Sequence, residues 1–300
     1  MNIRTGLKWS AGFAIAALAA ACSNMSLNNL NVGDVVNVAQ AVTGTQPDLP
    51  EPQEIELGRQ WAATLTGASP LVTDPGVQHY VNRVGMWIAQ QSERPGLPWH
   101  FGVLADDDIN GFATPGGYVF VTRGLLLRLN NESELAGVLG HEIAHVVCKH
   151  QLHAMQHQQG MSSLGNIVQS QVPGAGNNAL TQVVSDRVLA GFKEVLSTGL
   201  DRGDELQADR MGVVLAARAG YDPFGLPSVL QMLQGLNAQD GSVALLFATH
   251  PAPSVRLDAL DKAMGSGFDN YGGQAENADR FRKHIKALLA AAGTHNGKKG

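Results

Sequence analysis

The spacing of apolar and polar positions along the chain predicts a mostly helical fold with two short strands. Helical patterns occur in seven stretches, at about 51–65, 77–91, 133–150, 204–219, 224–236, 253–264 and 277–291. Residues 99–104 and 118–122 instead follow a strand pattern, and the Gly116-Gly117 pair before the second of them indicates a turn. The sequence therefore predicts an α+β fold that is predominantly helical.

The first 22 residues form a separate pattern. Arg4 and Lys8 precede an apolar run over 12–21, which is too short to span a membrane stably and is typical of a bacterial export signal. The run ends in Ala-Ala-Ala-Cys, which resembles a lipobox in which Cys22 becomes lipidated; ordinary signal-peptidase cleavage nearby is the alternative. Ser23 rather than Asp after the cysteine favours anchoring to the outer membrane, in the periplasm of a Gram-negative bacterium.

The remaining chain is expected to hold one domain. Residues 23–50 are rich in Asn, Val and Gly and predict a tether, residues 51–292 the domain, and residues 293–300 a tail. Within the domain, residues 151–199 are rich in Gln, Ser, Gly and Asn, and 179–196 is the best helical stretch among them. We expect this segment to be either a lid over the site or a hairpin that only packs.

Charge and cysteine content exclude two classes of protein. The net charge is -5 and no basic run stands out, so nucleic acid is not the expected partner. The chain has 2 cysteines, too few for a disulfide scaffold. If Cys22 carries lipid, Cys148 has no partner within the chain and must be buried to stay reduced outside the cytoplasm.

The clearest chemical signal is the motif H-E-x-x-H at residues 141–145. His141 and His145 lie one helical turn apart, so both imidazoles point to the same side and can bind one Zn²⁺. Glu142 lies about 100° around the helix, where it can take a proton from the attacking water. A surface helix with two solvated histidines is the alternative, and the apolar neighbours of the motif disfavour it.

A catalytic zinc needs a third protein ligand and one open position. Glu205 and Asp209 lie four residues apart on one predicted helix, so one carboxylate can bind the metal while the other holds the far nitrogen of a ligand histidine. The rival ligands are His150, His153 and His157. His153 and His157 also lie four residues apart, but they are in a polar, glutamine-rich stretch that we expect to be mostly exposed.

Several further motifs carry a family resemblance. They are N-G-F-A-T-P-G-G-Y at 110–118, T-R-G-L at 122–125, E-L-A-G-V-L-G-H-E at 134–142, D-R at 201–202 before Glu205, and T-H-P at 249–251 followed by Arg256. With these the chain resembles the CAAX-prenyl-protease-type metallopeptidases (metallopeptidase family 48), and within them the soluble periplasmic lipoprotein branch. Gly111 stands where that family usually has Ala.

The resemblance implies a zincin-like (gluzincin) fold with a small β-sheet beside the HExxH helix. It implies one Zn²⁺ per chain, held by His141, His145 and Glu205, with Glu142 as the general base. It also brings His250 near the metal, either to stabilise the oxyanion or to occupy the fourth zinc position as a latch; otherwise His250 only caps a loop before Pro251. Arg256 either does related electrostatic work or forms an ion pair with a carboxylate.

Together these features predict a zinc endopeptidase that hydrolyses unfolded or misassembled cell-envelope proteins. We expect an extended substrate to add to an edge strand formed by Tyr118, Val119 and Phe120, with Gly116 and Gly117 allowing its close approach. The alternative is a latent protease that acts mainly as a chaperone-like binder of outer-membrane proteins. An intact Glu142 favours the enzyme, and a permanently closed His250 favours the binder.

Overall fold

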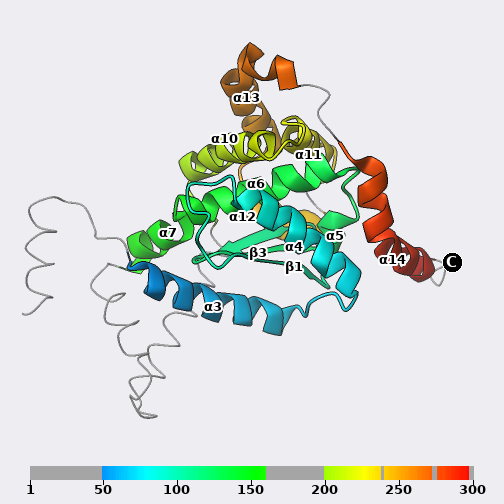
Figure 1. Cartoon of the computed structure of the whole chain (residues 1–300), viewed down its shortest axis with the longest axis horizontal. Helices are drawn as coiled ribbons and strands as arrows, with labels where there is room; N and C mark the ends of the chain where they lie inside the picture. The colour runs from blue at the N-terminus through cyan, green and yellow to red at the C-terminus, as the bar shows by residue number, and fades with distance from the viewer. Residues whose placement is uncertain (1–48, 160–198, 238–239, 272–275, 297–300) are drawn as a thin grey trace, which may run out of the picture. The chain divides into compact units, whose positions relative to one another are not determined.

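The computed structural model describes residues 49–159, 199–237, 240–271 and 276–296 (Figure 1). The described elements are, in chain order, α3 (Glu51–Ala68), α4 (Pro75–Ala89), β1 (His100–Leu104), β2 (Gly111–Thr114), β3 (Tyr118–Thr122), α5 (Arg123–Leu126), α6 (Glu132–Val147), α7 (His150–Gln159), α10 (Arg202–Arg218), α11 (Gly225–Gln234), η3 (Gly241–Val243), α12 (Ala244–Thr249), α13 (Pro253–Met264), η4 (Gly265–Tyr271) and α14 (Ala278–Asn296). The expected α+β, predominantly helical fold with a small sheet beside the HExxH helix is confirmed.

Local sequence accounts for where the central helices begin. Asp74 caps α4 by accepting a hydrogen bond from the backbone N–H of Val77, at 3.1 Å. Asn131 caps α6 in the same way through the N–H of Glu134, at 2.8 Å. The expected single helix over 133–150 ends at Val147, and α7 then begins at His150 after a sharp turn.

The sheet has three strands in the order β1-β3-β2. β3 pairs with β1 in parallel and with β2 in antiparallel orientation. The prediction that Tyr118, Val119 and Phe120 form an edge strand is therefore wrong, because both sides of β3 are already hydrogen-bonded to neighbours. Within the part of the chain that the structure describes, β2 pairs only with β3 and so forms an edge; the sequence pattern did not reveal this strand.

The two faces of β3 pack into different cores, because successive side chains of a strand point to opposite faces. Val119 and Val121 join the large core formed with α4, α6 and α11. Phe120 faces the other way, into a smaller core with Leu57 and Trp61 of α3. In Figure 1, α3 accordingly lies on one side of the sheet and α6 on the other.

Helices α6 and α10 cross at very close range, and two glycines make this possible. A Cβ atom on Gly140 of α6 would lie 2.7 Å from the carbonyl oxygen of Gly212 on α10. A Cβ atom on Gly212 would in turn lie 2.7 Å from the backbone nitrogen of His141. Any side chain at either position would push apart the two helices that carry the predicted metal ligands.

The predicted boundaries of the domain need two small corrections. Leu49 was expected in the tether, but it is buried and packs in the smaller core, since its apolar side chain is covered by α3. Residues 293–296 were expected in the tail, but the structure continues α14 to Asn296. The predicted export signal, most of the tether, the helix at 179–196 and most of the lid segment lie outside the described residues.

Among the described residues, we find no helix both long and apolar enough to cross a membrane.

Candidate metal centre

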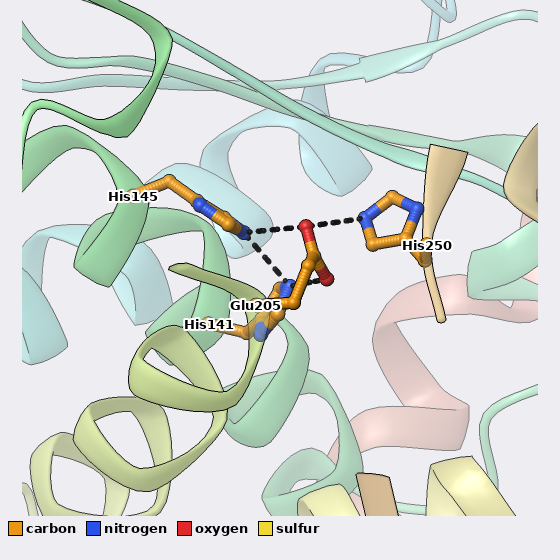
Figure 2. Close-up of side chains that lie close together, drawn as sticks. All are labelled: His141, His145, Glu205 and His250. Carbon is orange, nitrogen blue, oxygen red and sulfur yellow. Dashed lines mark hydrogen bonds and ion pairs between the residues drawn. The ribbon is translucent and has the colours of Figure 1, made fainter. Parts of the chain in front are cut away.

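Four side chains from three elements converge on one point (Figure 2). His141 and His145 come from α6, Glu205 from the first turn of α10, and His250 from the residue that ends α12. One potential ligand atom from each of the four lies within 4.8 Å of the others. The structure thus brings together the predicted ligand triad and His250, from segments that are spread over more than 100 positions of the sequence.

The distances within this cluster suit a single zinc ion. The Nε2 atoms of His141 and His145 lie 3.0 Å apart, and the carboxylate of Glu205 lies 3.7 Å and 3.5 Å from them, respectively. Ligand atoms on a tetrahedral zinc lie about 3.3 Å from one another. In addition, Oε2 of Glu205 is buried and has no hydrogen-bond partner among the described residues. Such an atom costs free energy unless a cation satisfies it, so the donor set fits the metal.

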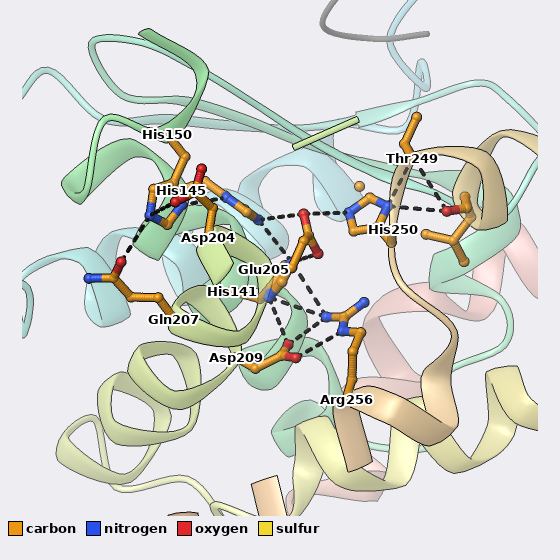
Figure 3. Close-up of polar contacts among 12 residues, drawn as sticks. His141, His145, His150, Asp204, Glu205, Gln207, Asp209, Thr249, His250 and Arg256 are labelled. Carbon is orange, nitrogen blue, oxygen red and sulfur yellow. Dashed lines mark hydrogen bonds and ion pairs between the residues drawn. The ribbon is translucent and has the colours of Figure 1, made fainter. Parts of the chain in front are cut away.

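His141 is held from behind by a buried ion pair (Figure 3). Its Nδ1 atom lies 3.0 Å from Oδ1 of Asp209, the contact expected for the carboxylate that orients a ligand histidine. Asp209 is itself bound by Arg256, whose Nε donates to Oδ2 at 2.9 Å. Burial opposes the charged form of Asp209, but the adjacent Arg256 outweighs it and holds the pKa of Asp209 well below its usual value.

The structure places Arg256 in the ion-pair arrangement that the sequence left as one of two alternatives. Its side chain is buried, and both of its contacts to Asp209 are within hydrogen-bond distance. A buried arginine that is paired in this way stays charged and fixes the carboxylate in place. Arg256 therefore contacts the metal centre through Asp209 and through the ring of His141, which lies 3.3 Å from its Nη2 atom.

Glu142 lies beside the cluster and lines the same cleft. Burial raises the pKa of its carboxyl to about 8, although the positive charge of Arg256 acts in the opposite direction. Burial also raises the pKa of Glu205 to about 8. A carboxylate with a high proton affinity, next to a metal centre, is what a general base requires.

The ring of His250 is oriented by the end of its own helix. Its Nδ1 atom lies 3.3 Å from the carbonyl oxygen of Leu246 and 2.9 Å from the hydroxyl of Thr249. A proton on Nδ1 satisfies the carbonyl and leaves a lone pair on Nε2, which faces Glu205 at 3.8 Å. Burial and the nearby Arg256 lower the pKa of His250 to about 3, so the ring is neutral.

His150, which the sequence left as a rival ligand, is buried, and its Nδ1 atom lies 2.9 Å from Nδ1 of His145. That nitrogen of His145 points away from the ligand cluster, so His150 stands behind a ligand rather than competing with it. His153 is partly buried farther along α7, and His157 is on the same helix. The recurrence of histidine five residues after His145 was the signal that could have found this contact.

The cleft over the cluster is narrow, with a volume of about 60 Å³. That volume holds roughly four water molecules, since one water needs about 10–15 Å³. Residues of β2 and of α12, with His250, both line it. The lining residues are Trp61, Asn110, Gly111, Phe112, Ala113, Glu142, His145, Gln151, Gly199, Leu200, Glu205, Leu245, Thr249 and His250.

The Gly116-Gly117 turn does not face the cleft, so its predicted contact with substrate is wrong. The backbone N–H of Gly116 donates to the buried carboxylate of Glu54 at 3.1 Å. A Cβ atom on Gly116 would lie 2.5 Å from Cα of Ile55, and its φ of 74° favours glycine. The close approach is thus made by α3, and Arg94 completes the same network with a 2.8 Å bond to Glu54.

Cys22, the predicted lipidation site, lies outside the described residues. Cys148 is free and half-buried, 3.7 Å from the sulfur of Met211.

Comparison with known proteins agrees with this geometry. The chain is 34% identical over 219 residues to the beta-barrel assembly-enhancing protease of Escherichia coli K12 and 33% identical over 218 residues to that of Yersinia pestis; each match covers 70% of this chain and 44% of the relative. It is 28% identical over 183 residues to the mitochondrial metalloendopeptidase OMA1 of Schizosaccharomyces pombe, covering 61% of this chain and 52% of that protein. The chain thus spans about half, or less, of the length of these relatives.

The names of these relatives agree with the predicted class of enzyme, a metalloendopeptidase. The sequence profile of peptidase family M48 matches residues 75–264, a range that includes every residue of the metal centre. Because this match covers more than half of the chain, the predicted family is confirmed, and the chain belongs to peptidase family M48.

Proposed function

We propose that this protein is a zinc endopeptidase that hydrolyses unfolded or misassembled proteins of the cell envelope. The observation that carries the proposal is the convergence of His141, His145 and Glu205 within ligand distance of one another, beside a buried carboxylate of high pKa, Glu142. The relatives named for β-barrel assembly support an envelope role.

In the proposed reaction Glu142 moves the proton. It takes a proton from the water that attacks the scissile carbonyl, and it returns this proton to the leaving amine. When bound, zinc supplies a Lewis acid that polarises the carbonyl and acidifies water. His141, His145 and Glu205 would hold the ion, and Asp209 fixes the ring of His141.

The corrected sheet order moves the proposed substrate contact from β3 to the open edge of β2. In an antiparallel pair, residues alternate between bonding the partner strand and facing outward. The N–H of Thr122 donates to the carbonyl of Asn110 at 3.0 Å, so the pair 110/122 is bonded, and the backbone groups of Gly111 and Ala113 point away from β3. The N–H of Gly111 already donates to Oδ1 of Asn110 at 2.9 Å, so Ala113 offers the N–H for pairing. An extended polypeptide can pair with it, whereas a tightly folded protein offers no free strand.

Substituting Ala113 tests this contact without breaking the sheet. Ala113→Pro removes an outward N–H, which proline can do on an edge strand at little cost to the ladder. We expect it to raise the KM for an unfolded protein substrate several-fold, by about 1 kcal/mol of lost backbone pairing. Ala113→Val keeps the N–H and serves as the matched control. Equal KM values for the two variants would refute edge pairing.

The activity itself is tested by cleavage of casein, an unstructured protein, with zinc-loaded wild type and Glu142→Gln. We expect cleavage by the wild type and none above background by the variant. Loss of activity in a zinc-free sample, and its return on adding zinc, would assign the reaction to the metal. Full cleavage by folded Glu142→Gln would reject Glu142 as the base.

A second candidate function is a latent protease that acts mainly as a chaperone-like binder of outer-membrane proteins. The position of His250 favours it, because Nε2 faces the cluster and α12 narrows the cleft to about 60 Å³. As a zinc latch, His250 would occupy the fourth position and keep water from it. We expect His250→Ala to raise casein cleavage, whereas a fall in kcat would assign His250 to stabilising the oxyanion instead.

We also propose that the protein is exported to the periplasm and held at the outer membrane by lipid on Cys22. The support is the export pattern of residues 1–22 and the envelope role named for relatives. Incorporation of labelled palmitate into wild type but not into Cys22→Ser, together with release of the variant into the soluble periplasmic fraction, is the expected result. Equal labelling of both would exclude Cys22 as the anchor.

A further inference from the structure

The ring of His150 faces the side of His145 that points away from the ligand cluster (Figure 3). The two Nδ1 atoms lie 2.9 Å apart, and His150 is only 2% exposed. The Nε2 atom of His150 continues the line toward α10, where it lies 3.4 Å from Oε1 of Gln207 and 3.7 Å from Oδ1 of Asp204. His150 therefore lies between His145 on one side and Gln207 and Asp204 of α10 on the other. Helix α10 also carries Glu205.

The direction of these hydrogen bonds follows from the ligand role of His145. Its Nε2 atom faces Glu205 at 3.5 Å and must present a lone pair to bind a metal, so the proton of the neutral ring lies on Nδ1. That N–H then donates to Nδ1 of His150, which must carry a lone pair. The proton of His150 therefore lies on Nε2, where the acceptor oxygens of Gln207 and Asp204 face it.

We propose that His150 is a positioning residue, which orients the zinc ligand His145 by accepting a hydrogen bond from it. This inference rests on the proposed ligand set. It extends the centre to a second, chemically different support: Asp209 holds His141 with a charge, whereas His150 holds His145 as a neutral acceptor. Such partners fix the ring and its tautomer, so their loss weakens metal binding about 10–100-fold.

The backbone before His150 is consistent with this role. Lys149 has a φ of 57°, a left-handed conformation that residues other than glycine rarely adopt. This turn ends the run of α6 and starts α7, and it points the first side chain of α7 back toward His145. In a continuous helix, residue 150 would lie about 140° around the axis from His145, on another face.

The test compares zinc affinity in variants that differ only in the acceptor. Asparagine carries Oδ1 on Cγ, where histidine carries Nδ1, so His150→Asn keeps an acceptor opposite His145, whereas His150→Leu keeps bulk and removes it. Both are made in the Glu142→Gln background, and zinc is titrated against a chromogenic chelator. We expect His150→Leu to bind zinc about 10–100-fold more weakly and His150→Asn to stay within about threefold of the parent.

Controls separate this inference from the proposed ligand set. His153→Leu, on the same helix, should leave zinc affinity unchanged, and His145→Ala should abolish tight binding. If His145→Ala binds zinc as well as the parent, the ligand set is wrong. If His145→Ala loses zinc but folded His150→Leu keeps it, or His150→Asn is as weak as His150→Leu, His150 is not a positioning residue.

A measurement on the unsubstituted ring covers the case in which His150→Leu does not fold. An N–H···N hydrogen bond transmits a scalar coupling between its two nitrogens. In the zinc-loaded Glu142→Gln protein labelled with ¹⁵N-histidine, we expect a coupling between Nδ1 of His145 and Nδ1 of His150. A protonated Nδ1 on His150, with no coupling, would overturn the proposal.

Discussion

Two buried glutamates on α6 differ in how the protein treats their charge. Glu132, in the first turn, is 1% exposed and is surrounded by partners: the hydroxyl of Tyr80 donates to it at 2.7 Å and Nε of Arg280 at 2.7 Å. Glu142, ten residues on, is 5% exposed. Burial dominates its environment and raises its pKa to about 8, and the charge that opposes burial comes from Arg256, which is bound to Asp209.

The difference shows how one helix serves both stability and chemistry. The charge of Glu132 is paired with Arg280, and its hydrogen bonds join α6 to α4 and α14. Glu132 therefore holds these three helices together. Glu142 is buried in the wall of the cleft and has a high proton affinity, which costs stability and provides a group that can exchange a proton. Four predictions can break or sharpen this comparison.

The largest expected effect is that of Glu142→Gln on peptide hydrolysis. The substitution keeps the shape of the side chain but removes its capacity to accept a proton, so kcat should fall about 10²–10⁴-fold. The free energy of unfolding should not decrease, because no paired charge is lost. The two quantities are measured by steady-state cleavage of a fluorogenic peptide and by urea unfolding. A large decrease in the free energy of unfolding would instead show that Glu142, like Glu132, mainly stabilises the fold.

Removal of zinc should have the next largest effect, a decrease in stability. We expect this decrease to be independent of Glu132, at the other end of α6. At zinc 100-fold above its Kd, bound metal stabilises the fold by about 2.7 kcal/mol, so a chelator should lower the Tm by several degrees. Because Glu132 is remote from the centre, Glu132→Gln should lose the same amount on chelation as the wild type. Unequal losses, measured by calorimetry, would mean that the two ends are coupled.

Glu132→Gln should itself reduce stability by about 2 kcal/mol without changing zinc affinity. The reason is that Gln keeps the volume but loses the charge-assisted bonds from Tyr80 and Arg280. Arg280→Met should cost at least as much, because it leaves the buried carboxylate of Glu132 without its cation. Urea unfolding measures both. A loss well below about 1 kcal/mol for Arg280→Met would contradict the pairing of Glu132 with Arg280.

The smallest expected effect concerns Cys148, at the other end of α6. Burial raises the pKa of its thiol, and the negative charges of Glu93 and Asp204 act in the same direction. At pH 8 the folded protein should therefore react with a thiol reagent more slowly than the urea-unfolded chain, since only the thiolate reacts. Cys22→Ser is the background for this assay. A faster reaction in the folded state would show that this end of the helix is more open than the structure indicates.

The sequence predicted those parts of the centre that depend on spacing within one element. His141 and His145 followed from the helical repeat, and Glu205 and Asp209 followed as a pair on a second helix. Neither pattern showed that Glu205 lies beside His141 and His145. That expectation came from the family resemblance. Most helix positions were predicted for the same reason, since the apolar repeat of each helix is local.

The predictions that were wrong concern contacts between elements. β2 has only four residues, GFAT, which do not give a strand pattern on their own, so β3 was taken for an edge. His150 was expected at the end of one helix over 133–150 and as a rival ligand, but one left-handed residue, Lys149, interrupts that helix and turns His150 toward Nδ1 of His145. Strand order and such turns are set by tertiary packing, which a periodic pattern does not record.

The close crossing of α6 and α10 sets the distance between the predicted metal ligands that the two helices carry. Gly140 and Gly212 let the backbones touch, and the ligands project from the two helices just beyond that contact. A single methyl group at either glycine would act as a spacer and widen the coordination shell, although neither residue touches the metal. The distance between the predicted ligands of the two helices therefore depends on two residues that have no side chains at all.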